Sequence, residues 1–278
     1  MNLFNKKLSI AFSLKNVIKI ILGLNNKDIN NIIQTAKAAE LISVTYLDII
    51  ANPKVVALLK SMINLPVCVS SIDPLELYNC ILMGADIVEL GNFDIFYGND
   101  IIFSAKEILE LAIETRRLIP NNDICITIPH HLSLSKQINL AKHLSDLSIN
   151  IIQTEGYSSK RKIGININDN ISYATNKASS SLSSTYAITQ EVNIPVISSS
   201  GLSYLSSGIS TFYGSSGVGI CSSIKKYTKI YDILYYIKQI LYVQSSSLNY
   251  RLNNQSCILF YNNSFKLKLK QYQIYKYY

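Results

Sequence analysis

The chain has 278 residues, of which 48% are hydrophobic, enough for a sizeable core in one domain. Its net charge of +8 is concentrated near the end: residues 225–278 hold nine Lys and Arg but one acid, which leaves 17 residues of each sign before position 225. This balance argues against a basic nucleic-acid-binding body. No apolar run reaches the length of about 20 residues that a membrane-spanning helix needs.

Short β-branched apolar runs alternate with amphipathic segments, a pattern typical of strands and helices in βαβ units. In chain order we expect strands at residues 17–24, 41–49, 66–72, 87–91, 124–129, 149–155, 195–200 and 217–222. Asn52-Pro53 and Asp73-Pro74 mark two helix starts, because each places a capping side chain before a proline at the first helical position. Ser104 and Glu107 have the spacing of a capping box, as do Asp73 and Glu76.

Eight regular strand–helix units predict a closed (β/α)₈ barrel, the TIM barrel, rather than an open doubly wound α/β sheet. Residues 1–248 are expected to form this barrel as a single domain. Residues 249–278, which are basic and rich in tyrosine, are expected to form a short C-terminal extension. Such an extension could pair at a strand edge, bind an anionic partner or remain a poorly ordered tail.

Ligands of this fold bind at the C-terminal ends of the strands, and the last two strands end in Ser and Gly. These small residues let backbone N–H groups converge on an anion, as in phosphate-binding barrels. We therefore expect a small phosphorylated molecule to be held by Ser199, Ser200, Gly201, Gly219 and Ser222. Tight turns that merely need small residues are the alternative. Asn25, Asn92 and Gln153, at other strand ends, are further candidate ligand-binding residues.

Charged side chains also occur in apolar strands, at Lys19, Glu89 and Glu155. If Glu89 and Glu155 both point inward, they could approach one another in the barrel mouth and acquire separate pKa values suited to acid–base work. Lys19 could neutralise one of them, and it is the one conceivable Schiff-base lysine. The alternative is a buried Lys–Glu network that only fills a polar layer of the barrel.

His130, which follows the fifth strand after Pro129, is a candidate for proton transfer. Strand alternation places it on the face of Ile124, Ile126 and Ile128, and a purely structural histidine is the alternative. No group of His, Cys, Asp or Glu has the spacing of metal ligands, and no dinucleotide or Walker fingerprint is present. We therefore expect neither a metal nor a cofactor.

Four segments carry a resemblance to a known family: LPVCVSS (65–71), GADIVELGNFDIFY (84–97), IPH (128–130) and IIQTEG (151–156). They closely resemble the plastid hypothetical reading frame number twenty-three family, over about residues 17–243. Members of that family look like aldolase-like or ribulose-phosphate-binding barrels, so the resemblance implies a plastid-encoded protein of the chloroplast stroma. It does not supply a reaction. Cys221 and Ser222 stand where a glycine and a serine are more usual, which weakens the expected phosphate contact at the eighth strand.

Two hypotheses follow. The first is an enzyme that moves a proton next to a carbonyl of a small phosphorylated metabolite (an isomerase, epimerase or lyase), with Lys19, Glu89, His130 and Glu155 as catalytic residues. The second is a ligand-sensing or assembly protein of the plastid stroma that keeps the barrel without turnover. Neither a membrane nor a nucleic acid is an expected partner, and the oligomeric state is left open.

Overall fold

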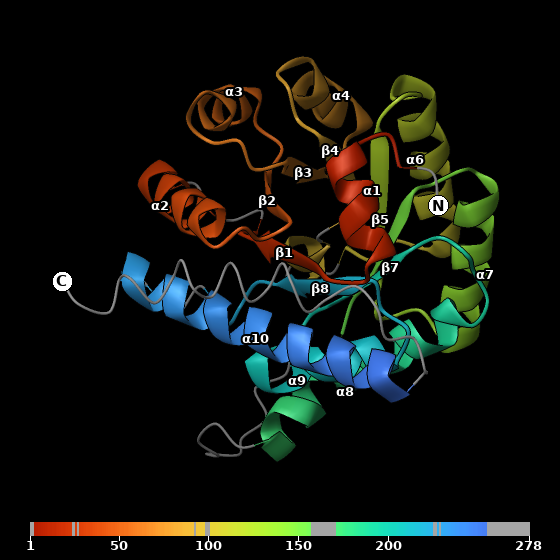
Figure 1. Ribbon diagram of the computed structural model, residues 1–278. Coiled ribbons are helices and arrows are strands. Elements are labelled where there is room, and N and C mark those ends of the chain that lie inside the picture. The colour runs from red at the N-terminus through yellow and green to blue at the C-terminus, as the bar shows by residue number, and fades with distance from the viewer. Residues whose placement is uncertain are drawn as a thin grey trace.

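A ring of eight parallel strands forms the centre of the computed structural model (Figure 1). The structure describes residues 3–23, 26, 28–91, 93–97, 101–156, 171–224, 227 and 229–254. Neighbouring strands pair in chain order and β8 closes onto β1, which confirms the expected (β/α)₈ barrel. The strands are β1 (Val17–Ile21), β2 (Tyr46–Ile50), β3 (Val67–Ser71), β4 (Ile87–Leu90), β5 (Asp123–Ile128), β6 (Ile151–Thr154), β7 (Val196–Ser199) and β8 (Gly217–Ile220).

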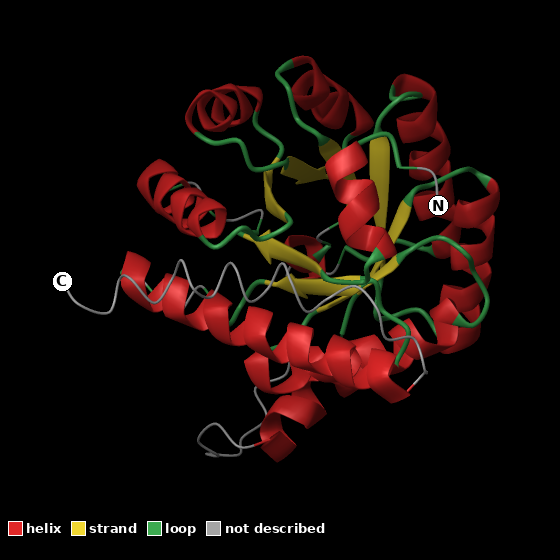
Figure 2. Cartoon of the chain, in the orientation of Figure 1, coloured by secondary structure: helices red, strands yellow, loops and turns green. Residues whose placement is uncertain are grey.

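Helices surround this ring on the outside (Figure 2). The described helices are α1 (Lys6–Ser13), α2 (Ile29–Leu41), α3 (Pro53–Met62), α4 (Pro74–Leu82), α5 (Asp94–Tyr97), α6 (Ala105–Leu118), α7 (Leu134–Asp146), α8 (Ile171–Thr189), α9 (Tyr204–Phe212) and α10 (Ile230–Asn254). Helix α5 is a single short turn in the connection between β4 and α6. In the described part of the chain, no helix combines the length and apolar character needed to cross a bilayer.

Local sequence signals account for most element boundaries, with two corrections. The second strand was expected from residue 41, but Leu41 ends α2, and the left-handed Ser43 (φ 59°) separates helix from strand. Ser104 and Glu107 form the expected capping box. At the start of α4, however, the Glu76 carboxylate accepts a hydrogen bond from Ser71 Oγ at 2.6 Å rather than completing a box with Asp73.

The N-terminal end of the barrel is closed by α1, which the sequence did not predict. Its Leu8 and Phe12 are fully buried against the lowest inward-facing layer, formed by Val17, Tyr46, Cys68, Ile87, Cys125, Ile151 and Ile197. The backbone N–H groups of Phe4 and Asn5 each donate to the Asp123 carboxylate at 3.0 Å, which ties the start of α1 to β5. Because this end is filled with apolar side chains, a ligand has access only from the opposite end.

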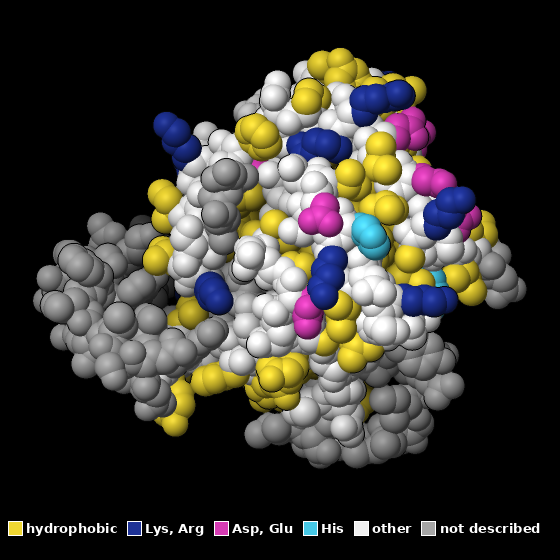
Figure 3. Space-filling model, turned by 90° about the vertical axis from the view of Figure 1, so that its right-hand side faces the viewer, with side chains coloured by type: hydrophobic (Ala, Val, Ile, Leu, Met, Phe, Trp, Pro, Cys, Tyr) yellow, Lys and Arg dark blue, Asp and Glu magenta, His cyan; other side chains and the backbone are white. Residues whose placement is uncertain are grey.

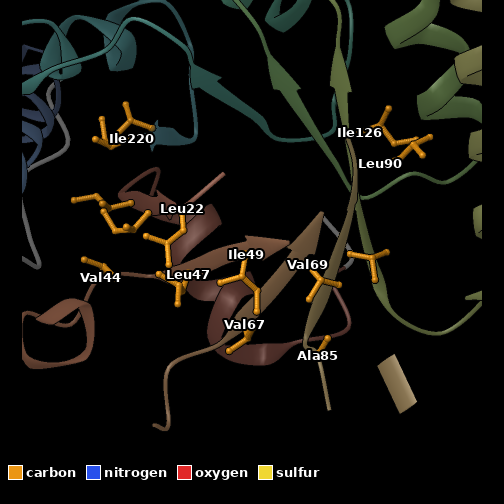
Figure 4. Close-up of a cluster of buried hydrophobic side chains, with 14 of the residues drawn as sticks. Leu22, Val44, Leu47, Ile49, Val67, Val69, Ala85, Leu90, Ile126 and Ile220 are labelled. Carbon is orange, nitrogen blue, oxygen red and sulfur yellow. The ribbon is translucent and has the colours of Figure 1, made fainter. Parts of the chain in front are cut away.

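A second and larger apolar core lies between the strands and the surrounding helices, where Leu47, Val69 and Ile126 are among the fully buried residues (Figure 4). Helix α8 departs from this pattern, since it meets β6 and β7 through buried hydroxyl groups. Thr185 Oγ1 lies 2.9 Å from Thr154 Oγ1 and 2.6 Å from Ser198 Oγ. Hydrogen bonds between side chains therefore help to hold α8 on the barrel.

Charges of both signs are interspersed on the face shown in Figure 3, as expected for a body without net charge. The division at residues 248 and 249 falls inside α10, which continues to Asn254. Residues 255–278 lie outside the described residues, so the proposed division into barrel and extension stays a prediction.

Candidate functional site

A layer of polar side chains crosses the barrel above the apolar layer. It consists of the inward-facing residues two positions further along six strands: Lys19, Asp48, Ser70, Glu89, Thr127 and Gln153. The alternation of strand side chains explains why these residues share one layer. All six are buried, and the side chains of Lys19 and Glu89 are fully inaccessible.

Lys19 is at the centre of this layer. Its Nζ lies 3.0 Å from Asp48 Oδ2 and 2.9 Å from Gln153 Oε1, and it also contacts Glu89 Oε2. The other Glu89 oxygen, Oε1, accepts hydrogen bonds from Thr127 Oγ1 at 2.9 Å and from Gln153 Nε2 at 2.8 Å. Three ammonium hydrogens thus meet three acceptors, so the network stabilises the charged form of the lysine.

The charges in this layer do not balance, because one ammonium faces two carboxylates. Burial lowers the pKa of Lys19, but the charges of Asp48 and Glu89 outweigh it and hold that pKa well above its usual value. Burial, together with the charge of Glu89, raises the pKa of Asp48 to about 6 despite the attraction of Lys19. Lys19 is therefore an ammonium at neutral pH, which makes it a hydrogen-bond donor rather than a Schiff-base nucleophile.

A second polar group lies at the C-terminal mouth of the barrel, around Glu155, the residue after β6. Glu155 Oε2 lies 2.9 Å from His130 Nδ1 and accepts a hydrogen bond from the Tyr97 hydroxyl at 2.7 Å. The backbone N–H of His130 also donates to this oxygen, at 3.2 Å. Glu155 and the His130 side chain are largely buried, so this carboxylate–histidine pair is held in place.

The predicted catalytic residues therefore divide between two groups. Lys19 and Glu89 meet as expected, and Gln153 joins them. Glu155, which was expected to approach Glu89, pairs with His130 instead. The expectation that His130 shares an inward face with Ile124, Ile126 and Ile128 is wrong: those residues pack toward the helices, and Cys125 and Thr127 point inward. His130 reaches the mouth because β5 ends at Ile128, and the strand alternation does not continue through Pro129.

The predicted phosphate turns lie beside this second group. Gly156 packs against the β7 turn, since an added Cβ would lie 3.4 Å from Ser200 Cβ. Ser200 and Gly201 both have left-handed backbones (φ 69° and 72°). A side chain at Gly201 would also collide with the carbonyl of Lys177, so packing against α8 already requires a glycine there.

Two of the predicted phosphate-binding residues, Ser199 and Gly219, lie inside β7 and β8 at the level of Lys19, and Ser199 Oγ donates to the Gly219 carbonyl at 3.4 Å. In the turn after β8, Ser222 is exposed. Ser223 Oγ donates to the Leu202 carbonyl at 3.0 Å and so links the β7 and β8 turns. A cavity of about 270 Å³ opens next to this turn, lined by Leu22, Asn26, Asp28, Asn31, Thr35, Ile224 and Tyr227.

Two predicted residues, Asn25 and Asn92, lie outside the described residues. Asp48 is a polar residue near the end of the predicted second strand, but the sequence assigned it no role, although a carboxylate in an apolar strand is the signal that identified Glu89. Sequence reasoning missed Tyr97, whose position on the loop before α6 carries no local signal. Among the described residues, no three His, Cys, Asp or Glu side chains gather where they could hold a metal ion.

The closed parallel barrel and its polar inner layer define the class of the protein, a single (β/α)₈ barrel. The chain belongs to the family described as a protein of unknown function (DUF561), whose sequence model matches residues 3–250. "Uncharacterized protein ycf23" of Antithamnion sp. is 44% identical over 253 residues, which cover 89% of this chain and 91% of the relative. The protein of the same name from Porphyra purpurea is 38% identical over 249 residues, covering 90% and 92%. The resemblance to the plastid-encoded reading frame family is thereby confirmed.

Solved structures share the fold at low sequence identity. The 3-hexulose-6-phosphate synthase of Salmonella typhimurium has a TM-score of 0.61 at 10% identity, covering 83% of this chain and 99% of that one. "QR15, an Aldolase" has a TM-score of 0.52 at 15% identity, covering 75% and 89%. At these identities the likeness shows the fold alone, the (β/α)₈ barrel.

Proposed function

We propose that this barrel binds a small phosphorylated metabolite at its C-terminal mouth and moves a proton next to the carbonyl group of that molecule, as an isomerase, epimerase or lyase does. The observation that carries the proposal is the pair of His130 and Glu155 at the mouth, with 2.9 Å between Nδ1 and Oε2. An imidazole oriented by a carboxylate is a common general acid–base device near neutral pH. His130 is the group that exchanges the proton, and Glu155 orients it.

The phosphate group would be bound by the ends of β7 and β8 and the turns that follow them, through Ser199, Ser200, Gly201, Gly219 and Ser222. Two observations support this placement. The β7 turn lies against Gly156, the residue after Glu155, so an anion bound at this turn would lie next to the proton-transfer pair. The similar fold of 3-hexulose-6-phosphate synthase belongs to a protein whose name contains a sugar phosphate.

Lys19, Glu89 and Gln153 lie deeper in the barrel than the mouth and would form the floor of the proposed site. Their hydrogen bonds fix the position of the Lys19 ammonium, which neutralises one of the two buried carboxylates of this layer and so would orient Glu89. Asn25 and Asn92, which follow β1 and β4 in the sequence and lie outside the described residues, are proposed as further ligand contacts.

The test is exchange of substrate hydrogen for deuterium in D₂O. Dihydroxyacetone phosphate and ribulose 5-phosphate serve as probes, and NMR follows the hydrogens next to the carbonyl. We expect exchange with the full-length protein and at least a ~100-fold slower rate with His130→Gln, the lower range of general acid–base contributions. His143→Gln, an exposed histidine on α7, is the matched control and should keep the wild-type rate.

A separate binding experiment tests the proposed phosphate site. Ser222→Asp introduces a negative charge at an exposed position of the β8 turn, so it should weaken binding of both probes without affecting folding. Ser61→Asp, exposed at the end of α3, is the control. Equal affinity of the two variants would overturn the proposed phosphate position.

A ligand-sensing or assembly protein without turnover is the second candidate function. It is favoured by the full burial of Lys19 and Glu89, whose hydrogen-bonding groups are occupied by one another and by Gln153. Probe binding without any deuterium exchange would select this candidate over the enzyme. For either function we place the protein in the plastid, as its family of plastid-encoded reading frames implies, and within it in the stroma.

A further inference from the structure

Three polar groups lie within hydrogen-bond distance of one oxygen atom, Glu155 Oε2. They are the Tyr97 hydroxyl at 2.7 Å, His130 Nδ1 at 2.9 Å and the His130 backbone N–H at 3.2 Å. Tyr97 comes from α5, on the loop that follows β4, whereas Glu155 and His130 follow β6 and β5. The loop after β4 therefore adds a polar contact to a pair that two other strands position.

The contact between Glu155 Oε2 and His130 Nδ1 bears on which ring nitrogen of His130 carries the proton. An ionised carboxylate oxygen only accepts hydrogen bonds, so the ring nitrogen that faces it must carry a hydrogen. In the neutral imidazole this places the proton on Nδ1 and makes Nε2 the basic nitrogen. The identity of the basic nitrogen thus depends on Glu155 keeping Oε2 directed at His130.

We propose that Tyr97 is a positioning residue which, through Glu155, keeps the proton of His130 on Nδ1. Its hydroxyl fixes the carboxylate rotamer, since rotation of Glu155 would break the bond at 2.7 Å. Its ring also packs edge-on against the His130 ring, with centroids 4.9 Å apart and planes at 89°. The inference rests on the proposed function in taking His130 as the proton-transfer group.

The same loop reaches the second histidine, which anchors it near the mouth. The Tyr97 ring packs against His131 with centroids 5.8 Å apart, and His131 Nε2 lies 2.9 Å from the Phe103 carbonyl. Phe103 in turn packs against Phe93 and Phe96. Tyr97 is therefore held from both sides, as a residue that positions another must be.

The experiment reads the tautomer directly, without a substrate. In full-length protein labelled with ¹⁵N-histidine, the imidazole nitrogen shifts show which nitrogen carries the proton. The chain has three histidines, so His131→Gln and His143→Gln identify the His130 signals. We expect Nδ1–H in the wild type at neutral pH, a mixture of tautomers in Tyr97→Phe, and loss of the preference for Nδ1–H in Glu155→Gln.

Tyr186→Phe removes the hydroxyl of an exposed ring on α8 and should leave the tautomer unchanged. A wild-type His130 that carries its proton on Nε2 would overturn the inference, and so would a Tyr97→Phe variant that retains pure Nδ1–H. Because Phe keeps the packed ring, a changed tautomer reports the hydroxyl rather than a folding defect. If the proposed function alone fails, deuterium exchange is absent while the tautomer pattern is as expected.

Discussion

Asp48 is the residue at which the charge imbalance of the barrel affects stability. It shares the Lys19 ammonium with Glu89, and burial raises its pKa from 3.8 to about 6. The folded state therefore binds the Asp48 proton more tightly than the unfolded chain. Stability from this group is fully present below about pH 4 and is lost as the pH rises through 6.

Asp48→Asn removes the titrating carboxyl group. The unfolding free energy of the variant should therefore depend on pH differently from that of the wild type between about pH 4 and 7. Between pH 4 and 7 the unfolding free energy of the wild type, relative to Asp48→Asn, should fall by about 2 kcal/mol, since each pKa unit corresponds to about 1.4 kcal/mol and part of the effect lies below pH 4. Urea denaturation at a series of pH values measures it. Asp146→Asn, which removes an exposed carboxylate at the end of α7, is the control, and equal slopes for both variants would contradict the prediction.

At the scale of elements, α1 closes one end of the barrel by inserting Phe12, which is fully buried, into the lowest layer. Phe12→Ala should lower the free energy of unfolding by about 3–5 kcal/mol, the usual range for a buried phenylalanine. Ile10→Ala on the same helix removes a side chain that is 63% exposed, and it should change stability by less than about 0.5 kcal/mol. Similar losses in the two variants would show that α1 does not seal the barrel.

At the scale of the whole molecule, the described barrel closes completely with residues up to Asn254. A chain that ends at Asn254 should therefore fold as the full-length protein does and bind phosphate probes with unchanged affinity. Thermal unfolding and probe titration of both chains provide the measurement. A large loss of stability in the shorter chain would assign residues 255–278 to the barrel rather than to an extension.

The order of elements was predictable from sequence because each parallel strand is an apolar run and several helix starts, those of α2, α3, α4 and α6 among them, are capped by a local side chain. Lys19 and Glu89 were predictable because charges are conspicuous in such runs, and Gln153 was predictable as a polar residue at a strand end, although not as their partner. Asp48 was recognisable as a polar residue near a strand end, but its pairing with Lys19 depends on the register between β1 and β2, which the sequence does not show.

The sequence carries no comparable signal for contacts between loops that are far apart along the chain. Tyr97 and Glu155 are 58 residues apart, and their hydrogen bond depends on where the loop before α6 folds in space. The position of His130 was wrong for a related reason, since alternation holds only while the strand continues, and β5 ends two residues earlier. Helix α1 was missed because eight residues give too short a pattern to separate a helix from a leader segment.

The barrel ring is least continuous where β6 meets β7. These two strands are aligned at two residue pairs, whereas every other junction has three or four. Glu155 and Ser200 are the residues that follow these two strands. A molecule bound to both residues would therefore link β6 to β7 at the junction with the fewest paired residues. Occupancy at 100 times the Kd would raise the unfolding free energy by about 2.7 kcal/mol. A rise in the melting temperature can therefore be used to screen candidate metabolites for the ligand.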